Sequence, residues 1–387
     1  MAAEGFLSVA EIDGRGRGLV STQPLKAGQT VLRDSPILLY SAFPFQNPSS
    51  YCNHCFRTLQ SSSINCSSCS ALFCSAACLS SATSSLHSPY VCQSLTRLSN
   101  SPHFFLNHPL ERQLQSRFLI AAYNLSLVSP SKFQILLSFQ GIPSANDASA
   151  AEFLHSLISS LCPPPPDSTP FALELTAILL AKDQLNAFGL MEPFNDGQRS
   201  VRAYGLYPMA SLFNHDCLPN ACRFDYVDAA VENVNNTDII VRMIHDVPQG
   251  REICLSYFPV NLDYAARQKR LLEDYGFACD CDRCKVEANW SDNENETVGE
   301  KQEEEEEEAM EEDQDEEMVG SENENEESDF PHAYFFMRYM CDGPNCWGTM
   351  APLPPSDVSP STVIECNVCG KFKNDIVEGG ENLSMDD

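Results

Sequence analysis

Eight potential metal ligands lie close together near the N-terminus, and their spacing constrains the fold more than any other feature. They are seven cysteines and one histidine, mostly in C-x-x-C pairs: Cys52, Cys55, Cys66, Cys69, Cys74, Cys78, His87 and Cys92. Ligands of this type and number suit two tetrahedral zinc ions. Because the segment is otherwise rich in Ser and Ala and too short for an apolar core, metal binding has to supply its folding free energy.

The chain contains 18 cysteines, and a disulfide cluster is the alternative interpretation. The N-terminus lacks a basic region followed by an apolar run, so we expect no export. Paired cysteines in a chain that is not exported indicate metal in a reducing compartment. We expect no membrane span, because no run of 18 apolar residues occurs. The Cys-rich segment has one Arg and no Lys, which disfavours DNA binding.

The formal net charge of −30 comes mainly from one tract. Residues 291–329 contain 21 acidic residues and one Lys, including six consecutive Glu. Such a segment cannot bury apolar area, so we expect a disordered, solvated linker. The alternative is a segment that attracts basic partners electrostatically.

The first forty residues predict four short strands, at 6–12, 18–22, 30–33 and 37–40. Between the first two lies Gly14-Arg15-Gly16-Arg17-Gly18. This turn is either a plain flexible connection or a backbone that approaches a ligand closely, with two Arg to meet a carboxylate.

Residues 94–190 predict helices. Leu114, Phe118, Ala121 and Leu125 recur on one helical face. Thr169-Pro170 predicts the start of a helix running from Phe171 to about Phe188. Asn186-Ala187-Phe188-Gly189 follows as a polar break that is either a helix C-cap or part of a site.

A ten-residue segment, 211–220, combines an apolar lead-in with Asn214-His215, Cys217 and Pro219-Asn220. It is too polar for a core strand, which indicates that it contacts a ligand. Strands are predicted on its C-terminal side at 239–244 and 252–257, with a turn at Pro248-Gln249-Gly250.

Two further cysteine groups follow. A helix predicted from Asp263 to Gly276, with Tyr264, Leu271, Leu272 and Tyr275 on one face, precedes Cys279, Cys281 and Cys284, for which Cys217 is the obvious fourth metal ligand. Near the C-terminus, Cys341, Cys346, Cys366 and Cys369 predict a small zinc ribbon with Trp347 and Phe372 as its apolar filling. The remaining Cys162, Cys222 and Cys254 suit buried thiols.

These pieces, in this order, resemble a SET-domain lysine methyltransferase with an inserted MYND zinc finger. The resemblance rests on the Gly14–Gly18 turn, Gly205-Leu206-Tyr207-Pro208, the Asn214–Asn220 motif, Gly250-x-Glu252-Ile253 with Ser256-Tyr257, and Tyr275-x-Phe277 with the cysteines after it. It covers residues 5 to about 285 and is greatest for plant members of the family. Asp216 stands where Ser is usual, and a short ribbon replaces the C-terminal helical repeat domain of animal relatives.

The resemblance implies an α+β, β-rich SET fold of short sheets with a pseudoknot, a helical insertion and a zinc-bound post-SET tail. It implies two interleaved finger sites, one of Cys52, Cys55, Cys74 and Cys78, the other of Cys66, Cys69, His87 and Cys92. The expected domains are SET N-terminal strands at 1–50, the MYND finger at 51–93, the helical insertion at 94–190, the catalytic core at 191–260, the post-SET segment at 261–290, the linker at 291–329 and the ribbon at 330–387.

The resemblance also implies a function: methyl transfer from S-adenosylmethionine to a lysine ε-amine. Tyr257 would be catalytic, and Tyr207 and Tyr275 would line the lysine channel. The cofactor-binding residues would be Arg15, Gly16, Arg17, Asn186, Asn214, His215, Tyr257 and Phe277. The imidazole of His215 is alternatively only structural.

Partners implied are a protein substrate, with histones as one option, and peptide ligands of the finger. We expect a monomer in the nucleus, the cytoplasm or both. An inert adaptor that recruits peptides through its zinc modules is the alternative function, and a metal-buffering protein is disfavoured because the ligand spacings suit closed structural sites.

Overall fold

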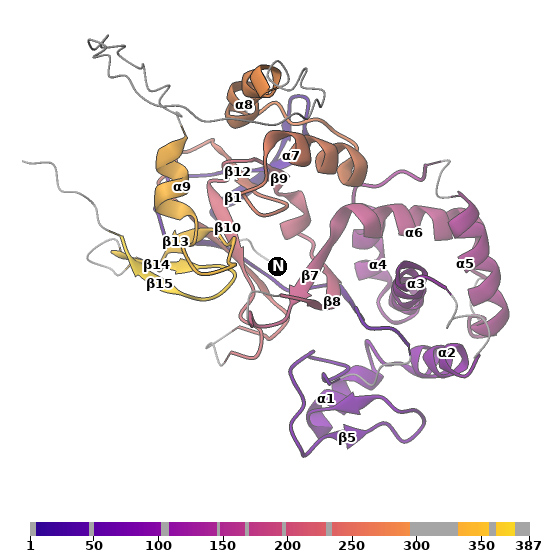
Figure 1. Ribbon diagram of the computed structural model, residues 1–387. Helices are drawn as coiled ribbons and strands as arrows, with labels where there is room; N and C mark the ends of the chain where they lie inside the picture. The colour runs from indigo at the N-terminus through magenta and orange to yellow at the C-terminus, as the bar shows by residue number, and fades with distance from the viewer. Residues whose placement is uncertain are drawn as a thin grey trace, which may run out of the picture. The chain divides into compact units, whose positions relative to one another are not determined.

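The computed structural model describes residues 5–45, 50–101, 108–144, 148–166, 170–195, 199–229, 234–294, 332–355 and 361–375 (Figure 1). The chain forms two compact units. The first contains Met1–Val260 together with Cys341–Asp387, and the second contains Asn261–Met340. Most of the predicted linker, 291–329, lies outside the described residues.

A four-stranded sheet joins distant parts of the first unit, in the order β1 (Leu7–Ile12), β2 (Gly16–Ser21), β12 (Glu252–Leu255) and β9 (Asn214–His215). β1 and β2 form an antiparallel hairpin whose turn is the Gly-Arg segment. β12 pairs antiparallel to β2 and parallel to β9. Strand β12 therefore lies between β2, which follows the N-terminal turn, and β9, which belongs to the 211–220 segment.

Two three-stranded sheets complete the strand-rich core. One has the order β10 (Ala221–Phe224), β11 (Ile239–Met243) and β3 (Thr30–Asp34); the other has β4 (Leu38–Ser41), β8 (Val201–Leu206) and β7 (Ala187–Met191). Leu19, Val241 and Ile253, which are completely buried, belong to the same apolar cluster. The predicted strands are present, with ends that differ by no more than two residues.

The helical insertion forms its own apolar core beside β4. Its helices are α2 (Pro89–Ser99), α3 (Leu110–Val128), α4 (Pro130–Leu137), α5 (Ala148–Leu161) and α6 (Leu173–Asn186). The predicted face of α3 is confirmed, since Phe118 and Leu125 are buried and Leu114 and Ala121 pack against the same cluster.

The ends of α6 differ from the prediction. The helix begins at Leu173, not Phe171, and its predicted N-cap, Thr169, lies outside the described residues. It ends at Asn186, and Gly189 lies within strand β7 and caps no helix. Pairing with β8 provides partners for this backbone, which local propensity could not indicate.

The Cys-rich finger contains little regular structure: β5 (Ile64–Asn65), β6 (Leu72–Phe73) and α1 (Ala76–Thr83). Its apolar cluster has only three buried members, Cys52, Phe73 and Ala82, and the residues around it are mainly further cysteines. This composition agrees with a segment that needs metal to fold.

The C-terminal ribbon is an antiparallel sheet of β13 (Met350–Pro352), β14 (Val363–Cys366) and β15 (Phe372–Asn374). Its predicted filling is wrong, because Trp347 is 51% exposed and Phe372 58% exposed. Met350 and Ile364 are buried there instead, packed against Phe194 of the SET core. The rings of Trp347 and Phe372 are exposed, and the Phe194 ring of the SET core packs against the buried residues of the ribbon in their place.

The second unit begins with α7 (Tyr264–Arg270), whose N-cap Asp263 accepts a hydrogen bond from the Ala266 amide. The helix continues as a π-turn, Leu271–Tyr275, and ends at Gly276 with φ 76°, as predicted. Leu272 is 62% exposed while Leu271 is buried, so the prediction that these two residues share a face was wrong. The wider π-turn changes the angular spacing on which the prediction rested. Helices α8 (Asp282–Glu294) and α9 (Ala333–Tyr339) follow.

None of the helices described here is long and apolar enough to cross a membrane.

Candidate active site and metal centres

The 211–220 segment is held in place by strand pairing at the edge of the four-stranded sheet. Asn214 and His215 pair with Cys254 and Leu255 of β12. The Asp216 amide then donates to the Leu255 carbonyl at 3.0 Å. A segment too polar for a core strand is thus ordered by two residues of parallel pairing.

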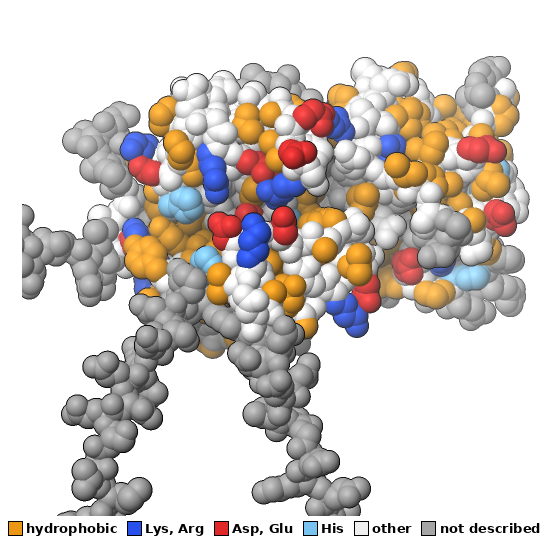
Figure 2. Space-filling view, turned by 90° about the horizontal axis from the view of Figure 1, so that it is seen from above, with side chains coloured by type: hydrophobic (Ala, Val, Ile, Leu, Met, Phe, Trp, Pro, Cys, Tyr) orange, Lys and Arg blue, Asp and Glu red, His pale blue; other side chains and the backbone are white. Residues whose placement is uncertain are grey.

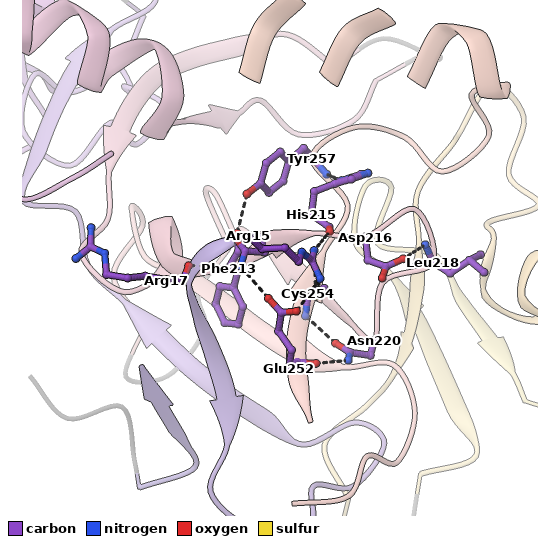
Figure 3. A network of polar contacts seen from close by, with 11 residues as sticks. Arg15, Arg17, Phe213, His215, Asp216, Leu218, Asn220, Glu252, Cys254 and Tyr257 are labelled. Atoms are coloured by element: carbon purple, nitrogen blue, oxygen red, sulfur yellow. Dashed lines mark hydrogen bonds and ion pairs between the residues drawn. The ribbon is translucent and has the colours of Figure 1, made fainter. Parts of the chain in front are cut away.

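Glu252 is the centre of a polar network beneath this segment (Figure 3). Its carboxylate accepts a hydrogen bond from Asn214 Nδ2 at 2.8 Å and an ion pair from Arg15 at 2.6 Å. Arg15 also donates to the His215 carbonyl oxygen. Burial lowers the pKa of Arg15, but nearby Cys254 and Glu252 outweigh that effect and raise it, so the guanidinium stays charged.

Gly18 is required by the close approach of this network. A Cβ atom there would lie 2.8 Å from both Asn214 Nδ2 and Glu252 Oε1, and 2.9 Å from Ile12. Because Gly18 has no side chain, Asn214 and Glu252 can approach the backbone of the predicted ligand-binding turn this closely.

Asn220 also binds the backbone of β12. Its side-chain amide donates to the Glu252 carbonyl at 2.7 Å and accepts from the Cys254 amide at 2.9 Å. Both ends of the 211–220 segment are thus attached to the same strand. The sequence analysis gave no site role to Glu252 or Cys254, although a charged residue at the start of an apolar strand could have indicated Glu252.

Tyr257 lies against the same segment. Its hydroxyl donates to the Phe213 carbonyl at 2.9 Å, and its amide donates to His215 Nδ1 at 3.2 Å. His215 is 1% exposed, and its Nε2 lies 3.3 Å from Cys217 Sγ. Both ring nitrogens of His215 therefore contact groups of the protein itself.

The remaining candidates lie in three places. Arg17 donates to the Ser138 carbonyl at 2.9 Å, and Asn186 donates to the Gln140 carbonyl at 2.8 Å, so both contact the loop after α4. Tyr207 is buried, with its hydroxyl donating to the Thr237 carbonyl at 2.7 Å. Tyr275 and Phe277 belong to the second unit, where their ring centroids are 6.5 Å apart.

The cysteines of the finger and the ribbon, together with His87, gather in three groups of four. In each group the ligand atoms lie within 4.8 Å of one another. The groups are Cys52, Cys55, Cys74 and Cys78; Cys66, Cys69, His87 and Cys92; and Cys341, Cys346, Cys366 and Cys369. Four soft ligands at this separation fit tetrahedral zinc. The remaining predicted set stays a prediction: Cys279, Cys281 and Cys284 belong to the second unit and Cys217 to the first.

Comparisons with known proteins point to one family. The SET domain family model matches residues 16–258. The chain is 59% identical over 400 residues to histone-lysine N-methyltransferase ASHR2 of Arabidopsis thaliana, covering 97% of both proteins. It is 25% identical over 299 residues to histone-lysine N-methyltransferase ASHR1 of the same plant, covering 76% of this chain and 58% of that one.

Among solved structures, the SET domain of LSMT bound to lysine and AdoHcy matches with a TM-score of 0.34 and 14% identity, over 72% of this chain and 54% of that one. The family model alone covers more than half of the chain. This chain belongs to the SET-domain family.

Proposed function

We propose that this protein is a protein-lysine N-methyltransferase that uses S-adenosylmethionine, with histones as its substrate class. The observation that carries the proposal is the Tyr257 hydroxyl fixed beside Asn214 and His215, over the Glu252 network. The ASHR2 relative, named as a histone-lysine methyltransferase, supports the substrate class.

The residues around the Gly-Arg turn fit the donor. Arg17 offers a cation for its carboxylate, and the Asn214 side chain is held beside the turn by Glu252. Gly16, with φ 72°, leaves the turn backbone open to close approach. Arg15, Asn186 and the backbone of His215 complete this set, and the Phe277 ring would stack on the adenine.

S-adenosylmethionine supplies a methyl group on a positively charged sulfur. The substrate lysine must lose its proton first, because an ammonium has no lone pair; an apolar channel lowers its pKa by desolvation. The amine nitrogen then forms a bond to the methyl carbon while the carbon–sulfur bond breaks and its electrons stay on sulfur. The Tyr257 hydroxyl would align the amine for this step, and Tyr207 and Tyr275 would line the channel.

The metal sites in this proposal are structural. Two zinc ions would be held by the finger, one by Cys217 with Cys279, Cys281 and Cys284, and one by the ribbon. Thiolate-rich, fully protein-ligated sites suit structural zinc, which leaves no open position for catalysis. The finger would bind peptide partners, and a histone substrate would place the protein in the nucleus.

The test is methyl transfer from labelled S-adenosylmethionine to core histones by the parent, Tyr257→Phe and the control Tyr334→Phe. Tyr334 is 59% exposed, so its hydroxyl should not matter. We expect Tyr257→Phe to lower kcat by about 100-fold or more, the scale of a lost group that acts in the transition state. Unchanged kcat would remove the role of Tyr257, and a parent that neither transfers label nor binds S-adenosylhomocysteine would favour the inert adaptor.

A further inference from the structure

The loop after α4 is held by three side chains at three successive carbonyl groups. The Ser138 carbonyl accepts from Arg17 at 2.9 Å, the Phe139 carbonyl from Lys182 Nζ at 2.6 Å, and the Gln140 carbonyl from Asn186 at 2.8 Å. Two of these donors belong to the proposed donor-binding set, and Lys182 lies between them.

Lys182 has a fixed position in this arrangement. It is one helical turn before Asn186 on α6, and Asn186 also donates to the Lys182 carbonyl at 2.8 Å. The loop presses against α6 so closely at Gly141, φ 130°, that a Cβ atom there would lie 2.5 Å from the Ala181 carbonyl oxygen. Helix and loop are therefore packed against each other with the lysine between them.

The charge of Lys182 is buried and has no acidic partner. The residue is 6% exposed, and within the part of the chain that the structure describes no carboxylate lies within 4 Å of Lys182 or Arg17. The next residue, Asp183, accepts instead from the Tyr40 hydroxyl at 2.7 Å. Burial lowers the pKa of Lys182, and the charge of Arg17 lowers it further. Buried charges are normally paired, so Lys182, with the half-buried Arg17 close enough to affect its pKa, indicates an anion that binds nearby.

We propose that Lys182 is a second cation for the carboxylate of the methyl donor, acting with Arg17 through the low-dielectric packing between α6 and the loop. The inference rests on the proposed function, because the anion is the amino-acid end of S-adenosylmethionine. Lys182 stabilises the bound carboxylate through its charge in this proposal, without touching it, and takes no part in methyl transfer. A lysine in the middle of an apolar helix carries no motif, so the sequence analysis did not select it.

The test compares two ligands that differ only in the carboxylate, S-adenosylmethionine and decarboxylated S-adenosylmethionine. Their dissociation constants are measured by calorimetry for the parent, Lys182→Met, Lys182→Gln, Lys182→Arg and Lys132→Met. Met matches the shape of the stem, Gln keeps an N–H donor and Arg keeps the charge. Lys132 is exposed and unpaired among the described residues, so its replacement removes the same charge where water screens it.

We expect the parent to bind the carboxylated ligand more tightly than the decarboxylated one. In the two neutral variants, Lys182→Met and Lys182→Gln, the ratio of the two dissociation constants should shrink about tenfold. Coulomb's law allows an effect of at least this size for unit charges up to about 12 Å apart at an effective dielectric constant of about 20. Lys182→Arg and Lys132→Met should keep the parent's preference.

Three outcomes overturn the inference. The parent could show no preference, the neutral variants could keep it, or they could weaken both ligands equally, which would be a purely structural effect. If one neutral variant does not fold, the other decides. A parent that binds neither ligand overturns the proposed function itself, whereas tight binding with an unaltered preference overturns only the role of Lys182.

Discussion

The buried ion pair between the ribbon and the SET core gives a quantitative prediction. Arg242 on β11 donates to Glu365 on β14 at 2.8 Å, and the two side chains are 3% and 8% exposed. The Tyr226 hydroxyl donates to the same carboxylate oxygen at 2.9 Å, and the Arg242 guanidinium lies 3.8 Å from the centre of the Phe224 ring. Glu365 is therefore the only carboxylate that compensates Arg242 among the residues described.

Replacing Glu365 by Ala removes the hydrogen bonds from Arg242 and Tyr226, each worth about 1.5–3 kcal/mol because the acceptor is charged, and leaves Arg242 buried without a carboxylate partner. Removing one partner of a buried pair costs about 3–5 kcal/mol in total. At about 2–4 °C per kcal/mol, the midpoint of thermal unfolding should fall by about 10 °C, measured by circular dichroism on zinc-replete protein.

The ribbon supplies a matched control. Lys371 and Asp342 form an ion pair of the same length, 2.8 Å, but their side chains are 48% and 55% exposed. Lys371→Ala should leave the midpoint of thermal unfolding almost unchanged, because water screens an exposed pair. Equal losses in the two variants would refute the reasoning that burial decides the magnitude. The double variant Arg242→Met, Glu365→Leu should recover much of the stability, since it leaves no buried charge.

Two further predictions concern single positions. Gly18→Ala should lower the free energy of unfolding by about 1–3 kcal/mol and weaken S-adenosylhomocysteine binding, because the added methyl group displaces Asn214 and Glu252. The control Gly250→Ala, at φ 81° with open space around it, should lower the free energy of unfolding by about 1 kcal/mol and leave binding unchanged. Equal binding by both variants would contradict this prediction. Burial raises the pKa of Asp183 to about 7, so ionising it disfavours the folded state, by an amount that grows from about pH 4 to pH 7 and then stays constant. Asp183→Asn should therefore stabilise the protein by about 1 kcal/mol more at pH 8 than at pH 6 in urea unfolding, and an equal gain at both values would count against the raised pKa.

The sequence by itself determined those features that depend on spacing along the chain. C-x-x-C pairs fix which residues can share a metal, and the structure groups the finger cysteines as the family resemblance implied. The start of a helix at Asp263 and its end at Gly276 could also be predicted, because a helix cap depends only on residues within one turn of the helix end. The Gly-Arg turn and the Asn-His segment also indicated a site, since polar residues in an apolar setting need a partner.

Only the tertiary structure decided which distant residues share an environment. Glu252 became the centre of the site because parallel pairing of β12 with β9 places it beside Asn214. Lys182 stood out only once folding had buried it without a carboxylate. Trp347 and Phe372 were misjudged because the SET core, not the ribbon, completes the ribbon's interior. The physical reason is common to all three: burial and charge compensation depend on what packs against a residue, and local sequence does not contain that information.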